Sequence, residues 1–183
     1  MLDSHYTNTH VFTQVFNQPD RFGGDEQFAE GLVNRLSILS AAPTSQKDTG
    51  SAPYVKTSVF GGGAIEDSIW NFSGISAPIK VLQDNTYGVG VTVTTPPLPD
   101  TPNFDGTVRS APLIVSANDQ IYPSVALETL RAFYDQPNYQ TRVTPEVGIE
   151  WIRMGRQSPI ETTSTSDVMI TYWNSFNRVS ASE

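Results

Sequence analysis

Residues 86–95 read TYGVGVTVTT, and this stretch decides the fold class. In an extended chain successive side chains point to opposite sides, so Val89, Val91 and Val93 share one face. The intervening residues are glycine and threonine, and threonine, like valine, favours strands. We therefore expect a strand over residues 87–95. Gly88 and Gly90 indicate a bulge, a twist or a close packing approach within it.

Prolines end this pattern at residues 96–106, which read PPLPDTPNFDG. Proline cannot donate to a β-ladder, so this stretch predicts a long exposed loop. Similar alternation predicts further strands before and after the loop. They cover residues 54–60, 64–72, 77–82, 107–116, 143–151 and 168–172.

Two segments have the apolar spacing of helices. In residues 25–39 the apolar stripe consists of Phe28, Leu32, Leu36 and Leu39, and residues 41–53 follow as a loop. In residues 123–134, Pro123 suits a helix start, Ser124 can cap the first turn, and Glu128 can pair with Arg131 three residues later.

Many short strands with two helices in the connections favour a mainly-β fold. We expect an antiparallel single jelly roll or β-sandwich, with an α+β domain built on one sheet as the alternative. The length of 183 residues predicts one β-barrel domain spanning residues 1–183. Within it, residues 1–20 form an N-terminal arm and residues 96–106 the proline-rich loop.

Composition excludes several functional classes. The net charge is −8 and the 11 basic residues are scattered, so we expect no direct binding of nucleic acid. The chain has no cysteine, which excludes disulfides, thiolate metal sites and cysteine nucleophiles. Residues 1–10 do not resemble a signal peptide, and no apolar run is long enough to span a bilayer.

Candidate catalytic groups are few. His5 and His10 are the two histidines, and both lie near the start of the sequence. Gly61–Gly63 lacks the lysine of a phosphate-binding loop. Acidic pairs, which could serve a glycosidase or hold a cation, occur at Glu146 with Glu150 and at Asp100 with Asp105. We expect no catalytic residue and no cofactor, and we leave a metal site open.

Aromatic residues on the predicted strands are the best candidates for contacts with other molecules. Tyr172 and Trp173 are neighbours on one strand, so their rings point to opposite faces. Burial in the core and a sugar-stacking platform are the alternatives. The predicted interface residues are Trp70, Trp151, Trp173 and Tyr172.

The strand at residues 86–95, the prolines that follow it and the strand DVMITYW at residues 167–173 together resemble a virion protein. Lysine is scarce, with three Lys against eight Arg. The chain is similar to single jelly-roll major capsid proteins, the smaller subunit, of tailless icosahedral membrane-containing viruses of halophilic archaea. This resemblance implies a virion location, a shell built with other capsid subunits, and an internal membrane nearby that the chain does not span.

Two other functional classes remain open at this point. One is a carbohydrate- or receptor-binding β-sandwich that uses exposed tryptophans. The other is a head-completion or decoration protein of a tailed virus. An enzyme ranks last, because the candidate acids have no identifiable partners.

Overall fold

The computed structural model describes residues 9–46, 59–61 and 64–172. In these ranges the chain forms thirteen strands, three α-helices and a short 3-10 helix, η2 (Glu66–Ser68). Strands predominate and the helices are short, so the expectation of a mainly-β protein with helices in the connections is confirmed. The number of α-helices is three, one more than expected.

The first sheet is built around the long central strand β2. Its strands are β1 (Thr9–Phe12), β2 (Leu36–Thr44), β5 (Gly74–Ser76) and β6 (Gly88–Val91). β2 is parallel to β1 and to β6, and its end pairs with β5 in antiparallel fashion. Parallel neighbours need a crossover connection, and helices α1 (Asp25–Leu32) and α2 (Lys80–Asn85) lie in these two connections. The predicted strand at 87–95 is confirmed for the four residues of β6, all of them buried.

The remaining strands form three smaller sheets. One contains β12 (Ile160–Glu161), β11 (Gly148–Met154), β10 (Tyr139–Thr144) and β3 (Val59–Gly61); the others are β4 (Asn71–Phe72) with β8 (Ile114–Ala117) and β9 (Gln120–Pro123), and β7 (Ser110–Pro112) with β13 (Asp167–Met169). β3 is parallel to β10, and β4 is parallel to β8. The expectation of wholly antiparallel pairing is therefore wrong, and across the described ranges the four sheets do not close into a barrel.

The helix predicted over residues 25–39 is too long. α1 ends at Leu32, because Asn34 adopts a left-handed backbone conformation with φ of 60°. Asparagine tolerates this conformation and often ends helices. Leu36 then begins β2, which continues to Thr44, so the first residues of the predicted loop at 41–53 belong to a strand. Residues 47–53 of that loop lie outside the described part of the chain.

The strand predicted over residues 77–82 is also wrong, because residues 80–85 form α2. Short apolar runs fit either period, and the alternation of Ala77, Ile79 and Val81 favoured a strand. The helix places Lys80 one turn before Asp84, and their side chains form an ion pair of 2.8 Å. The sequence signal that points to the helix is this i, i+4 pair.

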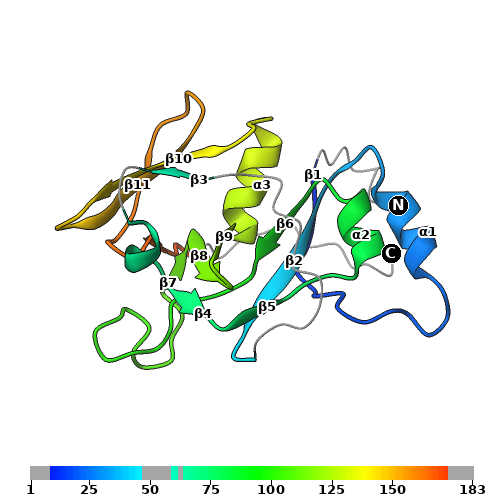
Figure 1. The fold of residues 1–183 in the computed structure, drawn as a ribbon, viewed down its shortest axis with the longest axis horizontal. Helices are drawn as coiled ribbons and strands as arrows, with labels where there is room; N and C mark the ends of the chain where they lie inside the picture. Colours follow the sequence, from blue (N-terminus) through cyan, green and yellow to red (C-terminus); the bar gives the residue numbers. More distant parts are fainter. Residues whose placement is uncertain (1–8, 47–58, 62–63, 173–183) are drawn as a thin grey trace.

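Helix α3 (Val125–Phe133) lies between two hydrophobic clusters that share strand β8. Val115 and Ala117 of β8 belong to the first cluster, with β2, β6, α1 and α2. Ile114 points the other way, into the second cluster with β10 and β11. Successive side chains of β8 point to opposite faces, so this strand contributes to both clusters. The clusters lie toward the two ends of the molecule, with α3 in the middle (Figure 1).

Residues 96–106 contain no strand, as predicted, but the loop is held from inside. Asn103 is buried, and its amide donates to the carbonyl oxygens of Thr95 and Ser110 at 2.9 and 3.0 Å. Its side-chain oxygen accepts from the N–H groups of Arg109 and Ser110. Leu98 and Phe104 remain exposed, so the loop is exposed only in part.

Candidate interaction site around helix α3

Helix α3 lies within the predicted range of 123–134 but begins at Val125, because Pro123 belongs to β9 and does not start the helix as predicted. Ser124 is in an extended conformation and its hydroxyl accepts from the N–H of Leu127 at 3.2 Å, which caps the first turn. Pro123 ends β9 directly before the cap. The predicted pairing of Glu128 with Arg131 is present at 2.8 Å.

The inner face of α3 carries this ion pair inside the protein. The side chains of Glu128 and Arg131 are only 2% and 6% exposed. Arg131 donates through two nitrogens to the two carboxylate oxygens, and the Tyr139 hydroxyl donates to the same carboxylate at 2.5 Å. Burial alone would lower the pKa of Arg131, but the hydrogen-bonded Glu128 carboxylate raises it above its usual value. The arginine therefore stays charged and paired.

Strand β6 can approach this face because of its glycines. A Cβ atom on Gly88 would collide with the Glu128 carboxylate. A Cβ atom on Gly90 would lie 2.6 Å from the Cα of Val125, which is backbone and cannot rotate away. The close packing approach that the sequence offered as one reason for these glycines is confirmed.

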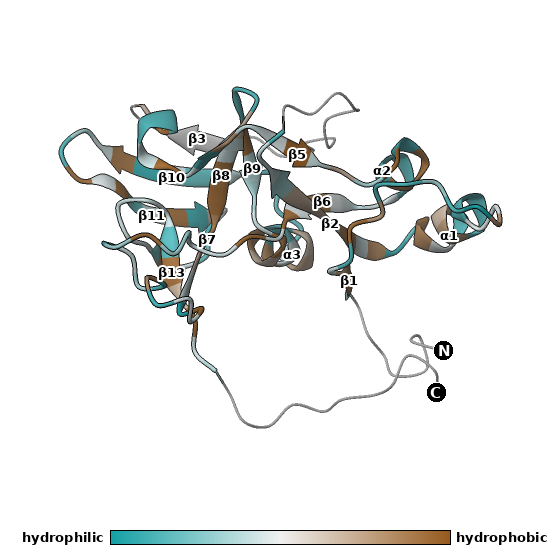
Figure 2. Ribbon diagram, turned by 90° about the horizontal axis from the view of Figure 1, so that it is seen from below, coloured by the Kyte–Doolittle hydropathy of each residue, from teal (hydrophilic) through white to brown (hydrophobic). Residues whose placement is uncertain are grey.

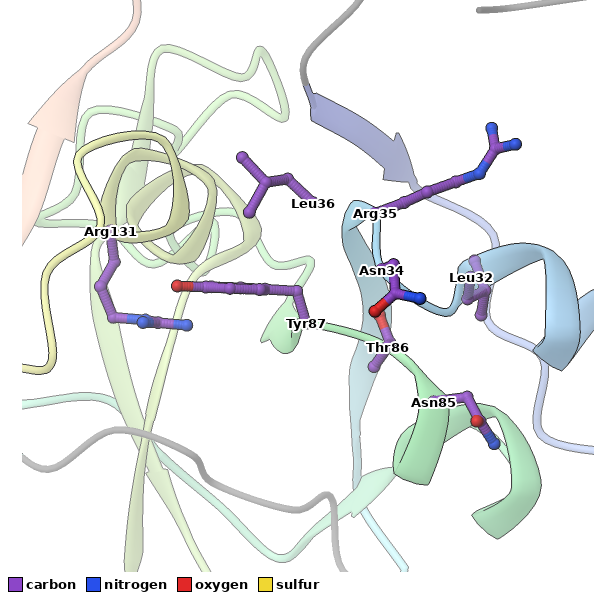
Figure 3. Close-up of a pocket in the computed structure, with 8 residues that line it drawn as sticks. All are labelled: Leu32, Asn34, Arg35, Leu36, Asn85, Thr86, Tyr87 and Arg131. Carbon is purple, nitrogen blue, oxygen red and sulfur yellow. The ribbon is translucent and has the colours of Figure 1, made fainter.

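A pocket of about 560 Å³ lies between this face of α3 and the β2–α2 corner (Figure 3). The Arg131 guanidinium faces the Tyr87 ring, 5.1 Å from its centroid, and Arg35 extends away from them (Figure 3). The third nitrogen of Arg131 donates to the carbonyl oxygen of Gln136, and the Tyr87 hydroxyl donates to Asp135 at 3.2 Å. Three of the five guanidinium N–H groups of Arg131, one on each nitrogen, therefore already donate within the chain.

The outer face of α3 has the opposite character. Ala126, Leu130 and Phe133 are exposed, and Phe133 is 57% exposed. These residues repeat at spacings of four and three, so they form one stripe along the helix. A surface helix normally buries its apolar stripe and exposes its charges. α3 buries Leu127 and Ala132 in this way, but it also buries the Glu128–Arg131 ion pair and leaves Ala126, Leu130 and Phe133 exposed.

An apolar groove of about 610 Å³ runs beside this stripe. It is formed by α3 together with β1, β6, β7 and the chain around β13, elements that share one side of the molecule (Figure 2). No charged residue is among the described residues that line it. They are Val11, Thr13, Val91, Thr92, Val93, Ala111, Pro112, Leu113, Ser124, Val125, Ala126, Thr129, Leu130, Val168 and Ile170.

The three predicted interface residues that the structure describes do not line this groove. Trp70 is half-buried against the first cluster, and its indole N–H donates to the Asp167 carboxylate at 3.2 Å. Trp151 is half-buried on β11, with the Arg153 guanidinium 5.3 Å from its ring centroid. Tyr172 is exposed, and its hydroxyl donates to the carbonyl oxygen of Val108. Trp173 lies outside the described residues.

Sequence reasoning missed the buried carboxylate of Asp167. It accepts from the hydroxyls of Thr95, Thr163 and Thr165 as well as from Trp70. Thr163 and Thr165 lie four and two residues before Asp167, whereas Thr95 and Trp70 come from distant segments of the sequence. Because each carboxylate oxygen is already hydrogen-bonded within the chain, Asp167 ties segments together.

The predicted acidic pairs do not converge. Glu146 is exposed in the β10–β11 turn, whereas Glu150 accepts from Thr144 and lies 3.2 Å from Arg142. Asp105 is paired with Arg109 at 2.7 Å, and Asp100 is exposed. Among the described residues no three His, Asp or Glu side chains cluster as metal ligands would. His10 lies on β1, and His5 is outside the described ranges.

In the part of the chain that the structure describes, no helix combines the length and apolar character needed to cross a membrane. A search with protein-family models gave no match, and neither the curated proteins nor the solved structures searched gave a significant one.

Proposed function

We propose that this chain is a structural subunit of a virion, a capsid protein that packs with other capsid chains into a shell. The single observation that carries the proposal is the polarity of α3. Its charged pair is buried, whereas Ala126, Leu130 and Phe133 form an exposed apolar stripe beside a groove with no charged residue among its described lining residues. Apolar patches of this kind on a soluble surface are typical of protein interfaces.

Other surface features support an assembly role. Phe22 is 96% exposed on the loop before α1, and Phe104 and Leu98 are exposed on the proline-rich loop. Such residues, presented at several places, suit a subunit with more than one neighbour. The proposal rests on these surfaces and the composition, and does not require the sheets to close as a jelly roll.

The two tryptophans that the structure describes, Trp70 and Trp151, give less support to sugar binding. The ring of Trp151 already stacks with Arg153, and Trp70 is held by Asp167 and the first cluster. Sugar stacking needs an open aromatic face. We therefore advance no carbohydrate-binding function.

The test is to purify the full chain and image it by negative-stain electron microscopy over a range of concentrations and ionic strengths. We expect regular oligomers or particles whose formation depends on salt, because each copy carries a net charge of −8. A monomer under every condition, also after mixing with the other structural proteins of the same virion, would contradict the proposal.

A further inference from the structure

The pocket between α3 and the β2–α2 corner has a positively charged lining in an acidic protein. Arg35 and Arg131 are two of the eight described residues that line it, and no acidic residue is among those eight. The chain as a whole carries a net charge of −8. A concave site lined by one sign of charge attracts ions of the opposite sign. The lining of this pocket therefore favours an anion.

Arg131 forms a buried wall of the pocket and is already held in place. Its side chain is 6% exposed, and Glu128 and the carbonyl oxygen of Gln136 accept hydrogen bonds from three of its five N–H groups. Two N–H groups are not used in these bonds. Because the guanidinium is fixed before a ligand arrives, a further hydrogen bond from it costs little conformational entropy.

Tyr87 gives the pocket a flat aromatic surface. The ring is half-buried and extends toward Arg131, and its hydroxyl donates to Asp135, which fixes its direction (Figure 3). Leu32 and Leu36 also line the pocket. Aromatic rings pair in offset-stacked or edge-to-face contacts. A ligand with a flat ring can therefore pack against Tyr87 and the two leucines.

Two asparagines line the side of the pocket opposite Arg131 (Figure 3). Asn34 is exposed, in a left-handed backbone conformation, and its amide makes no hydrogen bond with the residues that the structure describes. The amide nitrogen of Asn85 donates to the carbonyl oxygen of Val81 at 2.8 Å, which leaves its side-chain oxygen as an acceptor. A carboxamide can donate and accept, so these two side chains suit polar atoms on a ring.

We infer that this pocket binds a small organic anion, namely a carboxylate or phosphate group carried on a flat ring. The anionic group lies on the arginine side, the ring packs against Tyr87, and polar atoms of the ring meet Asn34 and Asn85. The volume of about 560 Å³ suits a ligand of this size. The inference goes beyond the proposed function, because it concerns a ligand of the single chain and does not require assembly.

Isothermal titration calorimetry of the full chain tests the inference with two ring-bearing anions, benzoate and adenosine 5′-monophosphate. Adenosine and inorganic phosphate, which each lack one half of the proposed chemistry, are the comparison probes. We expect at least one ring-bearing anion to bind more tightly than either comparison probe, and more weakly as salt rises. Preference for benzoate assigns an aromatic carboxylate, and preference for the nucleotide assigns a phosphate on a heteroaromatic ring.

Charge substitutions at the rim test where the ligand lies. Asn34→Asp keeps a residue that tolerates the left-handed backbone and adds a negative charge, so it should weaken binding at least about threefold. Asn118→Asp, in an exposed left-handed turn outside the pocket, is its matched control. Arg35→Gln should weaken binding about two- to fivefold, whereas Arg156→Gln, exposed in the turn after β11, should leave it unchanged.

Tyr87→Leu removes the flat surface and should weaken binding of a stacked ring at least about fivefold. Circular dichroism shows whether each variant is folded, and Asn34→Asp carries the test if Tyr87→Leu does not fold. Absence of binding by both ring-bearing anions would overturn the inference. Equal affinities for Asn34→Asp and Asn118→Asp would also overturn it, because the ligand then lies elsewhere. Neither result bears on assembly into particles, which is measured separately.

Discussion

The two faces of α3 differ in how far their side chains are already paired or packed within the chain. On the inner face Glu128 accepts hydrogen bonds from Arg131 and Tyr139, so the pocket beside Tyr87 lies next to groups that are already paired. On the outer face Leu130 and Phe133 are exposed. The inner face, whose polar groups are paired with one another, stabilises the fold. The outer face, whose apolar side chains are exposed, is available to a partner.

The largest predicted effect comes from breaking the inner face. Glu128→Met leaves the buried Arg131 charge without its carboxylate and should lower the free energy of unfolding by about 3–5 kcal/mol. Chemical denaturation measures this change. Glu30→Met, on the exposed surface of α1, is the matched control and should stay within about 0.5 kcal/mol.

Adding Arg131→Met to Glu128→Met should restore part of the lost stability, because no unpaired charge is then buried. A double variant that is less stable than Glu128→Met alone would show that Arg131 stabilises the fold independently of Glu128.

The next effect concerns the close contact that presses α3 onto β6. Gly90→Ala places a methyl group against the Val125 backbone and should destabilise the fold by about 1–3 kcal/mol. Gly31→Ala in α1 meets no atom within 4 Å and should instead stabilise by about 0.5–1 kcal/mol. Thermal unfolding should show a lower melting temperature for Gly90→Ala and a higher one for Gly31→Ala. Equal changes in the two variants would refute the packing argument.

An effect of similar size is expected at the buried carboxylate of Asp167. Asp167→Asn replaces one acceptor oxygen with an amide that must itself donate, among donors from Trp70 and Thr95. The expected loss is about 1–3 kcal/mol by denaturation. Asp119→Asn, in an exposed turn with a left-handed backbone that asparagine accepts, is the control. Equal stability of the two variants would mean that Asp167 ties nothing together.

The smallest effect lies on the proline-rich loop. The Arg109 guanidinium and the Thr107 N–H hold the pKa of Asp105 well below its usual value. A depressed pKa in the fold means that the pair contributes stability above about pH 4, the ordinary aspartate value, and loses it as pH falls further. An NMR titration should place the midpoint of Asp105 well below pH 4. Asp105→Asn should abolish the change in the Arg109 side-chain chemical shift that accompanies this titration. A midpoint near 4 would contradict the pairing.

Sequence patterns predicted these features unequally. Local signals were sufficient for α3, because Ser124, Glu128 and Arg131 act within one or two turns. They failed at Leu36, where a helical spacing continued past Asn34 into a strand, since the backbone reversal there is a single-residue event. Local signals also favoured antiparallel pairing, although strand partners depend on crossovers between distant segments.

Most residues of the candidate site could not be predicted from the sequence. The prediction selected the largest aromatic residues, but Trp70 and Trp151 are held by Asp167 and Arg153. The apolar groove combines β1, β6, α3 and the chain after β13, which only the tertiary fold brings together. The one local clue was the spacing of Ala126, Leu130 and Phe133 around a helix that also carries Glu128 and Arg131.

The central claim is that the outer face of α3 is an association surface, and the dependence of thermal stability on protein concentration tests it most directly. Association stabilises the folded state by mass action, so the wild-type melting temperature should rise with concentration. The melting temperature of Phe133→Ala should stay constant over the same range. A wild-type melting temperature that does not change with concentration would contradict the account.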